Sequence, residues 1–103
     1  VQIGIVPVSS SHHEYCEKLT RKLKTIGLRV NLDLSDDKMR AKVRRMEMEK
    51  TPIVFVIGDQ EVEKGGISVR SRKEGNLGFM TLDNFLDRIK PELDMGVPKY
   101  IMD

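Results

Sequence analysis

Glu61 and Arg70 are the two residues whose types and spacing point to the most specific chemistry. Glu61 lies in the stretch Gly58-Asp59-Gln60-Glu61-Val62-Glu63, and Arg70 lies in Ile67-Ser68-Val69-Arg70-Ser71-Arg72. A carboxylate and a guanidinium held side by side on a sheet either pair with each other or recognise a ligand with matching donors and acceptors. The chemistry of the two residues alone favours the intramolecular ion pair.

Base recognition in single-stranded RNA is the alternative use of this pair. A carboxylate accepts two hydrogen bonds from guanine, and a guanidinium donates two to base acceptors or to a phosphate. Single-stranded loops expose these base edges, whereas duplex RNA hides them. Alternation along the residues from Ile67 to Arg72 places Arg70 and Arg72 on a face that points away from the core.

A second candidate surface is the segment between Lys38 and Lys50, which holds six basic residues against two acidic ones. Helical spacing gives it an apolar stripe of Met39, Val43 and Met46, a flank of Lys38, Lys42 and Arg45, and a second flank of Arg40 and Arg44. One interpretation is an amphipathic helix whose charged flanks are simply solvated. The other is a set of phosphate contacts, each adding salt-sensitive affinity for nucleic acid.

Other chemistries find little support in the residue pattern. His12 and His13 are the only histidines, and together with Cys16 they do not make up a metal-binding set. The junction Pro7-Val8-Ser9-Ser10-Ser11 lacks the glycines of a phosphate-binding loop. We expect no Ser-His-Asp arrangement and no catalytic site, and we expect Cys16 to be a half-buried helix residue rather than a reactive thiol.

Local patterns predict the elements that position these residues. Strands are predicted at residues 1–8, 28–34, 53–57, 67–72 and 77–80. Helices are predicted at residues 12–26, from about residue 36 to residue 50, and from Leu82 to Pro91, which should kink or end the last helix. Long crossovers predict parallel pairing of the first three strands, and the last two should form an antiparallel hairpin.

These elements add up to an α/β domain with a five-stranded mixed sheet and three helices. The chain of 103 residues suffices for one domain, which we expect to span residues 1–94 with residues 95–103 as its C-terminal tail. No apolar run is long enough to span a membrane. A start at Val1 without a signal peptide suggests a domain cut from a longer cytoplasmic protein.

In order along the chain, several motifs resemble the C-terminal anticodon-binding domain of threonyl-tRNA synthetase, a class II aminoacyl-tRNA synthetase. The resemblance is carried by Leu28-Arg29-Val30, Lys38-Met39, Lys42-Val43-Arg44, Lys50-Thr51-Pro52, Gly58-Asp59-x-Glu61-Val62-Glu63, Val69-Arg70-x-Arg72 and Leu77-Gly78. It covers essentially the whole chain and implies the α/β fold of these domains. Related domains occur in the histidyl, prolyl and glycyl enzymes.

The resemblance implies a role for each candidate residue. Positions matching Glu61 and Arg70 read anticodon bases, and positions matching Arg44 and Asp36 also contact the anticodon loop. The contacts expected with the RNA backbone come from four further residues: Lys38, Arg40, Lys42 and Arg72. Threonine anticodons share a middle guanine followed by uracil, and the guanine offers the hydrogen-bond donors that a carboxylate such as Glu61 can accept. The sequence departs from the family at Asp36, usually Asn, and at Arg40, usually Gly.

For the whole protein, the resemblance implies a ligase that joins threonine to its tRNA with ATP. Its ATP, magnesium and zinc sites would lie in an upstream catalytic domain of the same chain, and the full-length enzyme would be a homodimer. We expect no cofactor, metal or catalytic residue in this domain, and no membrane. Two alternatives stay open: an accessory or protein-interaction module with the same fold, or the anticodon domain of a histidyl, prolyl or glycyl synthetase.

Overall fold

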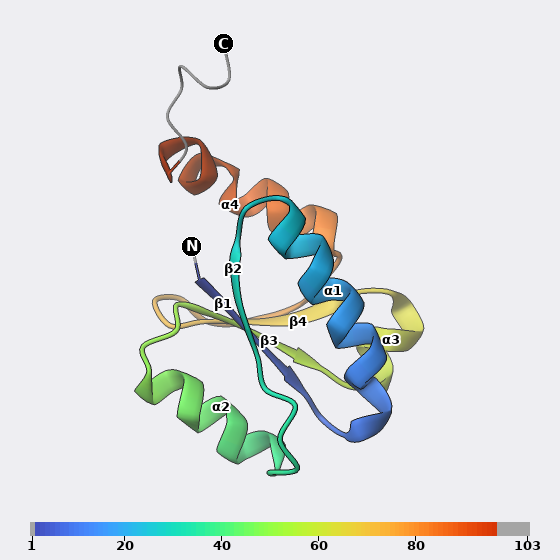
Figure 1. The fold of residues 1–103 in the computed structure, drawn as a ribbon. Coiled ribbons are helices and arrows are strands. Elements are labelled where there is room, and N and C mark those ends of the chain that lie inside the picture. The colour runs from blue at the N-terminus through green and yellow to red at the C-terminus, as the bar shows by residue number, and fades with distance from the viewer. Residues whose placement is uncertain (1, 97–103) are drawn as a thin grey trace.

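Five strands form one mixed sheet in the computed structural model, which describes residues 2–96 (Figure 1). The strands are β1 (Gln2–Pro7), β2 (Arg29–Leu32), β3 (Ile53–Ile57), β4 (Ile67–Ser71) and β5 (Gly75–Met80), in the spatial order β2-β1-β3-β4-β5. Both β2 and β3 run parallel to β1, whereas β4 is antiparallel to β3 and β5 to β4. The predicted mixed sheet, with its parallel half and its hairpin, is confirmed.

Three of the helices were predicted and one was not. The predicted ones are α1 (His13–Thr25), which follows a 3-10 turn η1 (Ser10–His12), α2 (Met39–Met48) and α4 (Leu82–Gly96). The fourth, α3 (Asp59–Lys64), turns the expected corner after β3 into a short helix. Gly58 caps its start and Gly65, at φ +70°, ends it, a conformation that glycine adopts without steric cost.

The sheet separates two apolar layers, because alternate residues of each strand point to opposite faces. On one face, the strands pack against α1 and α4; this layer includes Ile3, Ile5, Leu19, Leu23, Phe55, Ile57, Val69, Phe85 and Ile89. On the other face, the strands pack against α2; this layer consists of Val6, Val43, Met46, Val54 and Val56. Figure 1 shows α1 and α2 on opposite sides of the central strands.

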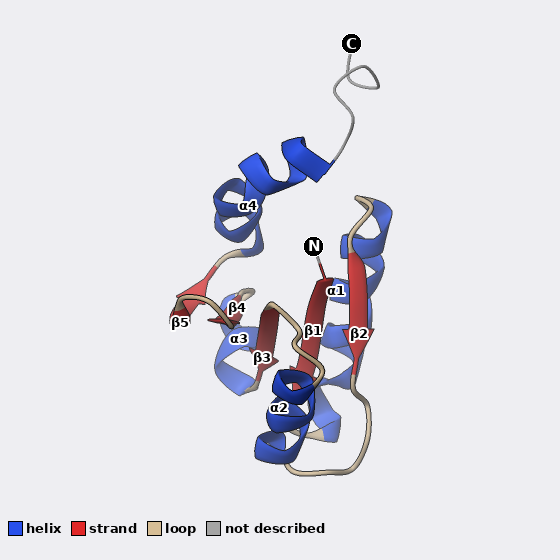
Figure 2. Cartoon of the chain, turned by 90° about the vertical axis from the view of Figure 1, so that its left-hand side faces the viewer, coloured by secondary structure: helices blue, strands red, loops and turns tan. Residues whose placement is uncertain are grey.

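Helix α2 covers only part of its face, and this shapes the candidate site. Its apolar layer draws on β1 and β3 and includes no residue of β4 or β5. Gly4 of β1 permits this close approach, since a Cβ there would lie 2.0 Å from the Sδ of Met46. Within the described residues, the β4–β5 half of the face is therefore not part of the α2 layer (Figure 2).

Two boundaries differ from the predictions. Helix α2 begins at Met39, after a loop, because Asp33 accepts a hydrogen bond from the backbone of Ser35 and Arg45 pairs with both Asp33 and Asp37. Helix α4 continues through Pro91 to Gly96, so the proline does not end it, and Figure 2 shows its axis changing direction. The proposed boundary at 94/95 falls inside α4, and the rest of the predicted tail, 97–103, lies outside the described residues.

Candidate nucleic-acid interface

Arg70 lies on the α2 face of the sheet, where β4 is not covered. It is the partner of Val54 in the β3–β4 register, and Val54 packs under α2. A hollow of about 520 Å³ separates the strand from the helix and is lined by Met39, Arg40, Val43, Arg44, Glu47 and Arg70. Three guanidinium groups from two elements thus surround a space whose apolar wall comes from α2.

Helix α2 is rotated so that the flank of Arg40 and Arg44 faces solvent, whereas the flank of Lys38, Lys42 and Arg45 is partly buried against the sheet. Arg40 and Arg44, one turn apart, are exposed toward the hollow. Lys42 is 2% exposed, and its Nζ donates a hydrogen bond to the carbonyl oxygen of Pro7 at 3.3 Å. The flank predicted for Lys42 therefore meets the sheet rather than solvent, and its ammonium bonds to a backbone carbonyl oxygen instead of being free for the expected phosphate contact.

Glu61 does not pair with Arg70. Its Oε1 accepts the backbone N–H of Gly58 at 2.7 Å, and its Oε2 accepts the hydroxyl of Ser68 at 2.9 Å. Within the described residues, no ion pair joins Glu61 to an arginine, so the interpretation as an ion pair is wrong. Glu61 as a whole is 8% exposed, and each carboxylate oxygen keeps a further lone pair for a donor from outside.

Ser68 connects Glu61 to the arginine hollow. Ser68 and Arg70 are two residues apart on β4 and therefore point to the same face of the sheet. The carboxylate of Glu61, from α3, therefore lies at the beginning of β4, and the guanidinium of Arg70 lies further along the same strand. This places the two residues expected to read bases on one face, at separate positions rather than in contact.

The loop before α2 brings Asp36 and Lys38 to the surface. Both side chains are exposed, and Lys38 is the residue before the first turn of the helix. The loop is held by Asp33, which accepts from Ser35 and from Arg45. Burial raises the pKa of Asp33, but hydrogen bonding by Ser35 and the charge of Arg45 outweigh it and lower the pKa below its ordinary value. Arg45 therefore forms ion pairs with two residues of the loop, Asp33 and Asp37.

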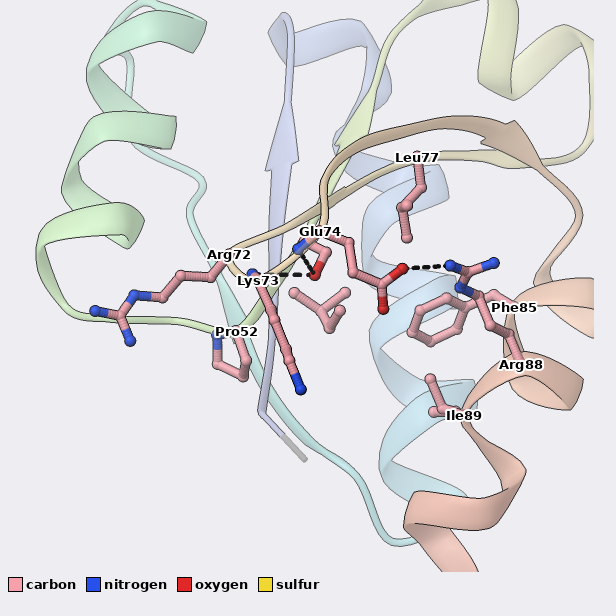
Figure 3. Close-up of a pocket in the computed structure, with 10 residues that line it drawn as sticks. Pro52, Arg72, Lys73, Glu74, Leu77, Phe85, Arg88 and Ile89 are labelled. Atoms are coloured by element: carbon pink, nitrogen blue, oxygen red, sulfur yellow. Dashed lines mark hydrogen bonds and ion pairs between the residues drawn. The ribbon is translucent and has the colours of Figure 1, made fainter.

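Arg72 lies at the far end of β4 from Ser68. Its backbone N–H donates to the carbonyl oxygen of Pro52, the residue before the central strand β3. Arg72 is one of the residues at a hollow of about 610 Å³ on the α4 side, and Figure 3 shows its guanidinium pointing away from Leu77 and Phe85 of the apolar wall. The structure therefore does not bring Arg72 together with Glu61.

Phe79 is a residue of this face that the sequence analysis missed. It is the register partner of Ser68 across β4 and β5, and it is 40% exposed. The Nζ of Lys64, at the end of α3, lies 5.7 Å from the centre of its ring. A signal was present in the sequence, since Phe79 lies between Leu77 and Met80, which pack partly buried against the core on the other face of the strand.

A Ser-His-Asp chain of hydrogen bonds is present, contrary to the prediction. The Oγ of Ser9 lies 3.2 Å from Nδ1 of His12, and Nε2 of His12 lies 2.6 Å from Asp59. The backbone N–H of Ser9 also donates to the same Nδ1, at 3.2 Å. The lone pair of Nδ1 is therefore engaged by the main chain, and His12 links the start of α1 to the start of α3 rather than activating the serine.

Cys16 is fully buried in the α1 layer. Burial raises the pKa of its thiol to about 12, which keeps it protonated and unreactive at neutral pH. The interpretation as a packed helix residue is confirmed, with more burial than expected.

Within residues 2–96, no group of three or more His, Cys, Asp or Glu side chains is placed to hold a metal ion. No described helix is long and apolar enough to cross a membrane.

Comparisons with known proteins bear on the family and the fold of the chain. A family model described as "Anticodon binding domain" matches residues 2–92. The chain is 45% identical over 92 residues to a threonine–tRNA ligase of Aquifex aeolicus, covering 89% of this chain and 14% of that protein. It is 42% identical over 93 residues to one of Caldanaerobacter subterraneus, covering 90% of this chain and 14% of that protein. The chain thus spans about a seventh of the length of these relatives.

Solved structures share the fold. The RNA binding domain of threonyl-tRNA synthetase from Cryptosporidium parvum superposes with a TM-score of 0.82 at 23% identity, covering 87% of this chain and 23% of that chain. The histidyl-tRNA synthetase of S. aureus superposes with a TM-score of 0.73 at 24% identity, with the same coverage of 87% and 23%. At these identities the likeness extends to the architecture alone.

Proposed function

The chain belongs to the anticodon binding domain family, and on that premise we propose that it reads the anticodon loop of threonine tRNA within a threonine–tRNA ligase. The observation that carries this proposal is the shared placement of Arg40, Arg44 and Arg70 around one hollow. An RNA loop brings phosphates to such a cationic surface. Glu61, on the same face, supplies the acceptor that a guanine edge requires.

We assign the residues separate tasks. Glu61 accepts hydrogen bonds from the middle guanine of the anticodon, and its two existing bonds hold the carboxylate in place beforehand. Arg70 contacts the neighbouring base, while Arg40 and Arg44 bind phosphates. Preorganisation of this kind reduces the conformational entropy that binding would otherwise cost.

The remaining candidates lie around this centre. Exposed Asp36 and Lys38 extend the surface from the loop before α2, Asp36 by accepting from a base amine and Lys38 by binding a phosphate. Arg72 binds the RNA backbone at the other end of β4. Lys42 is buried, so we assign it the task of holding α2 on β1 rather than a phosphate contact.

For the whole protein, we propose ATP-dependent ligation of threonine to its tRNA by a cytoplasmic homodimer. The ATP, magnesium and zinc of such an enzyme would be held by its catalytic domain, in the part of the longer chain outside these residues. The donor sets described in residues 2–96 do not fit a metal ion.

The test is binding of this chain to labelled stem-loops with the threonine anticodon, with the middle guanine replaced by adenine, and with the loop scrambled. The proposal expects the threonine loop to bind best, by about 1–3 kcal/mol over the single replacement. Equal binding to all three would refute anticodon reading and favour an accessory module. A fourth titration uses a stem-loop with a histidine anticodon, and preference for that loop would assign the domain to the histidyl enzyme instead.

A further inference from the structure

Phe79 stands out because it is a large aromatic residue left exposed on the sheet. It lies on the α2 face, on the β4–β5 half, with 40% of its surface accessible. Its ring leans across β4 toward Gly66, where an added Cβ would lie 2.4 Å from the ring's Cζ. The close approach that Gly66 permits holds the ring near the beginning of β4, where Glu61 also lies.

The ring and the Glu61 carboxylate flank the same residue. Ser68 donates to Oε2 of Glu61 at 2.9 Å and is the cross-strand partner of Phe79. Side chains of such partners begin about 4.5–5.5 Å apart. A nucleobase whose edge meets Glu61 therefore has an aromatic surface beside it. Stacking on an aromatic side chain is the usual way in which proteins hold a single-stranded base.

Lys64 supplies a cation at the same place. Its Nζ lies 5.7 Å from the ring centre, and within the described residues it takes part in no ion pair. An exposed cation–π contact is weaker than the stacking of a base on an aromatic ring. An incoming base can therefore replace the ammonium at the ring and leave it to bind a phosphate.

We propose that Phe79 is the stacking platform for the base that Glu61 reads, and that Lys64 binds the phosphate of the same nucleotide. The occupant is a nucleotide of single-stranded RNA, because the acceptor, the aromatic surface and the cation match its base edge, base face and phosphate. This inference rests on the proposed function and adds to it a base-stacking residue outside the motifs that carry the family resemblance.

The test combines Phe79→Leu with an abasic position in the RNA. The chain and its variant are titrated with the threonine anticodon stem-loop and with the same stem-loop lacking the middle base. Stacking is worth about 1–3 kcal/mol per base, so Phe79→Leu should weaken binding of the intact loop about 5- to 150-fold. It should leave binding of the abasic loop unchanged, and Phe79→Tyr, which keeps the ring, should restore binding of the intact loop.

The salt dependence of RNA binding distinguishes the role of Phe79 from that of Lys64. Phe79→Leu should leave the slope of log K against log salt unchanged, whereas Lys64→Gln should reduce it by about 0.7, the contribution of one phosphate in a single strand. Thermal melting checks that each variant is folded at the assay temperature.

The outcomes distinguish this inference from the proposed function. If Phe79→Leu weakens the intact and abasic loops equally, or weakens neither while the wild type still prefers the threonine loop, the stacking platform is refuted and anticodon reading stands. If the wild type binds all loops equally, anticodon reading fails. The comparison of intact and abasic RNA then still decides whether Phe79 stacks on a base.

Discussion

Glu61→Gln is the substitution that most directly tests base reading, because it changes one atom and keeps the shape of the side chain. The amide oxygen can still accept the N–H of Gly58, now 2.7 Å from Oε1. The amide nitrogen would face Ser68, whose hydroxyl can accept as well as donate. The local fold should therefore persist, while an acceptor that faces the ligand becomes a donor.

The cost in stability follows from the two hydrogen bonds. Bonds to a charged group contribute about 1.5–3 kcal/mol and neutral ones about 0.5–1.5 kcal/mol, so making both neutral should lower the free energy of unfolding by about 2 kcal/mol. A carboxylate in the first turn of α3 also interacts with the helix dipole, which adds at most about 1 kcal/mol. Glu61→Ala should cost more, because it leaves the buried N–H of Gly58 without this acceptor.

Glu61→Gln should also weaken the preference of the chain for guanine at the middle anticodon position. A bidentate contact to a base is worth about 1–3 kcal/mol of discrimination, which corresponds to about 5- to 150-fold in the dissociation constant. Fluorescence anisotropy should be measured with stem-loops that carry guanine, inosine or adenine at the middle position. Inosine lacks the exocyclic amine, so the wild type should rank guanine first and inosine second, and Glu61→Gln should bind all three about equally.

Glu63→Gln is the matched control. Glu63 lies on the same short helix but is exposed, and the same chemical change there should leave the ranking intact. Thermal melting of both variants gives the folded fraction at the assay temperature, by which the binding curves are corrected. Full retention of guanine discrimination by folded Glu61→Gln would show that this carboxylate reads no base.

Further predictions concern α2, the sheet and the core. Arg44→Gln should reduce the salt slope of RNA binding by about 0.7, whereas Lys42→Met should leave it unchanged, since the ammonium of Lys42 is already inside; equal slopes in the two variants would contradict these assignments. Gly4→Ala should lower the free energy of unfolding by about 1–3 kcal/mol, measured by urea titration, because the new Cβ would overlap Met46. The thiol of Cys16 should resist iodoacetamide at pH 8 until denaturant is added, because burial raises its pKa. The unfolded thiol ionises first, so stability should fall by about 1.4 kcal/mol per pH unit above its ordinary pKa of 9.0 until the pH reaches about 12, and Cys16→Ala should lack this loss.

Local sequence patterns were sufficient for the order and type of the main elements. The apolar run Ile53–Ile57 predicted a strand, and that strand is the central one between β1 and β4. The long crossovers predicted parallel pairing, and the short runs after Gly58 predicted the hairpin. These features follow from side-chain period and chain length, which are properties of the sequence alone.

Other features were decided only by the packing of elements that are distant in sequence. A helical repeat assigns Lys42 and Arg44 to different flanks, but it cannot say which flank meets the sheet. Contact of α2 with β1 through Gly4 settled this by burying Lys42 and exposing Arg44. The partner of Glu61 was likewise settled by the return of β4, which brought Ser68 rather than Arg70 to the carboxylate.

The sequence by itself therefore determined the fold and identified the acid and the arginines, because residue type and periodicity are local. The tertiary structure decided which of these groups share a surface. Glu61 is held by a backbone amide and a hydroxyl, Arg70 faces a hollow with the arginines of α2, and Phe79 joins them from β5. Strand register and the rotation of a helix against a sheet set such neighbours, and both depend on contacts between residues far apart in the chain.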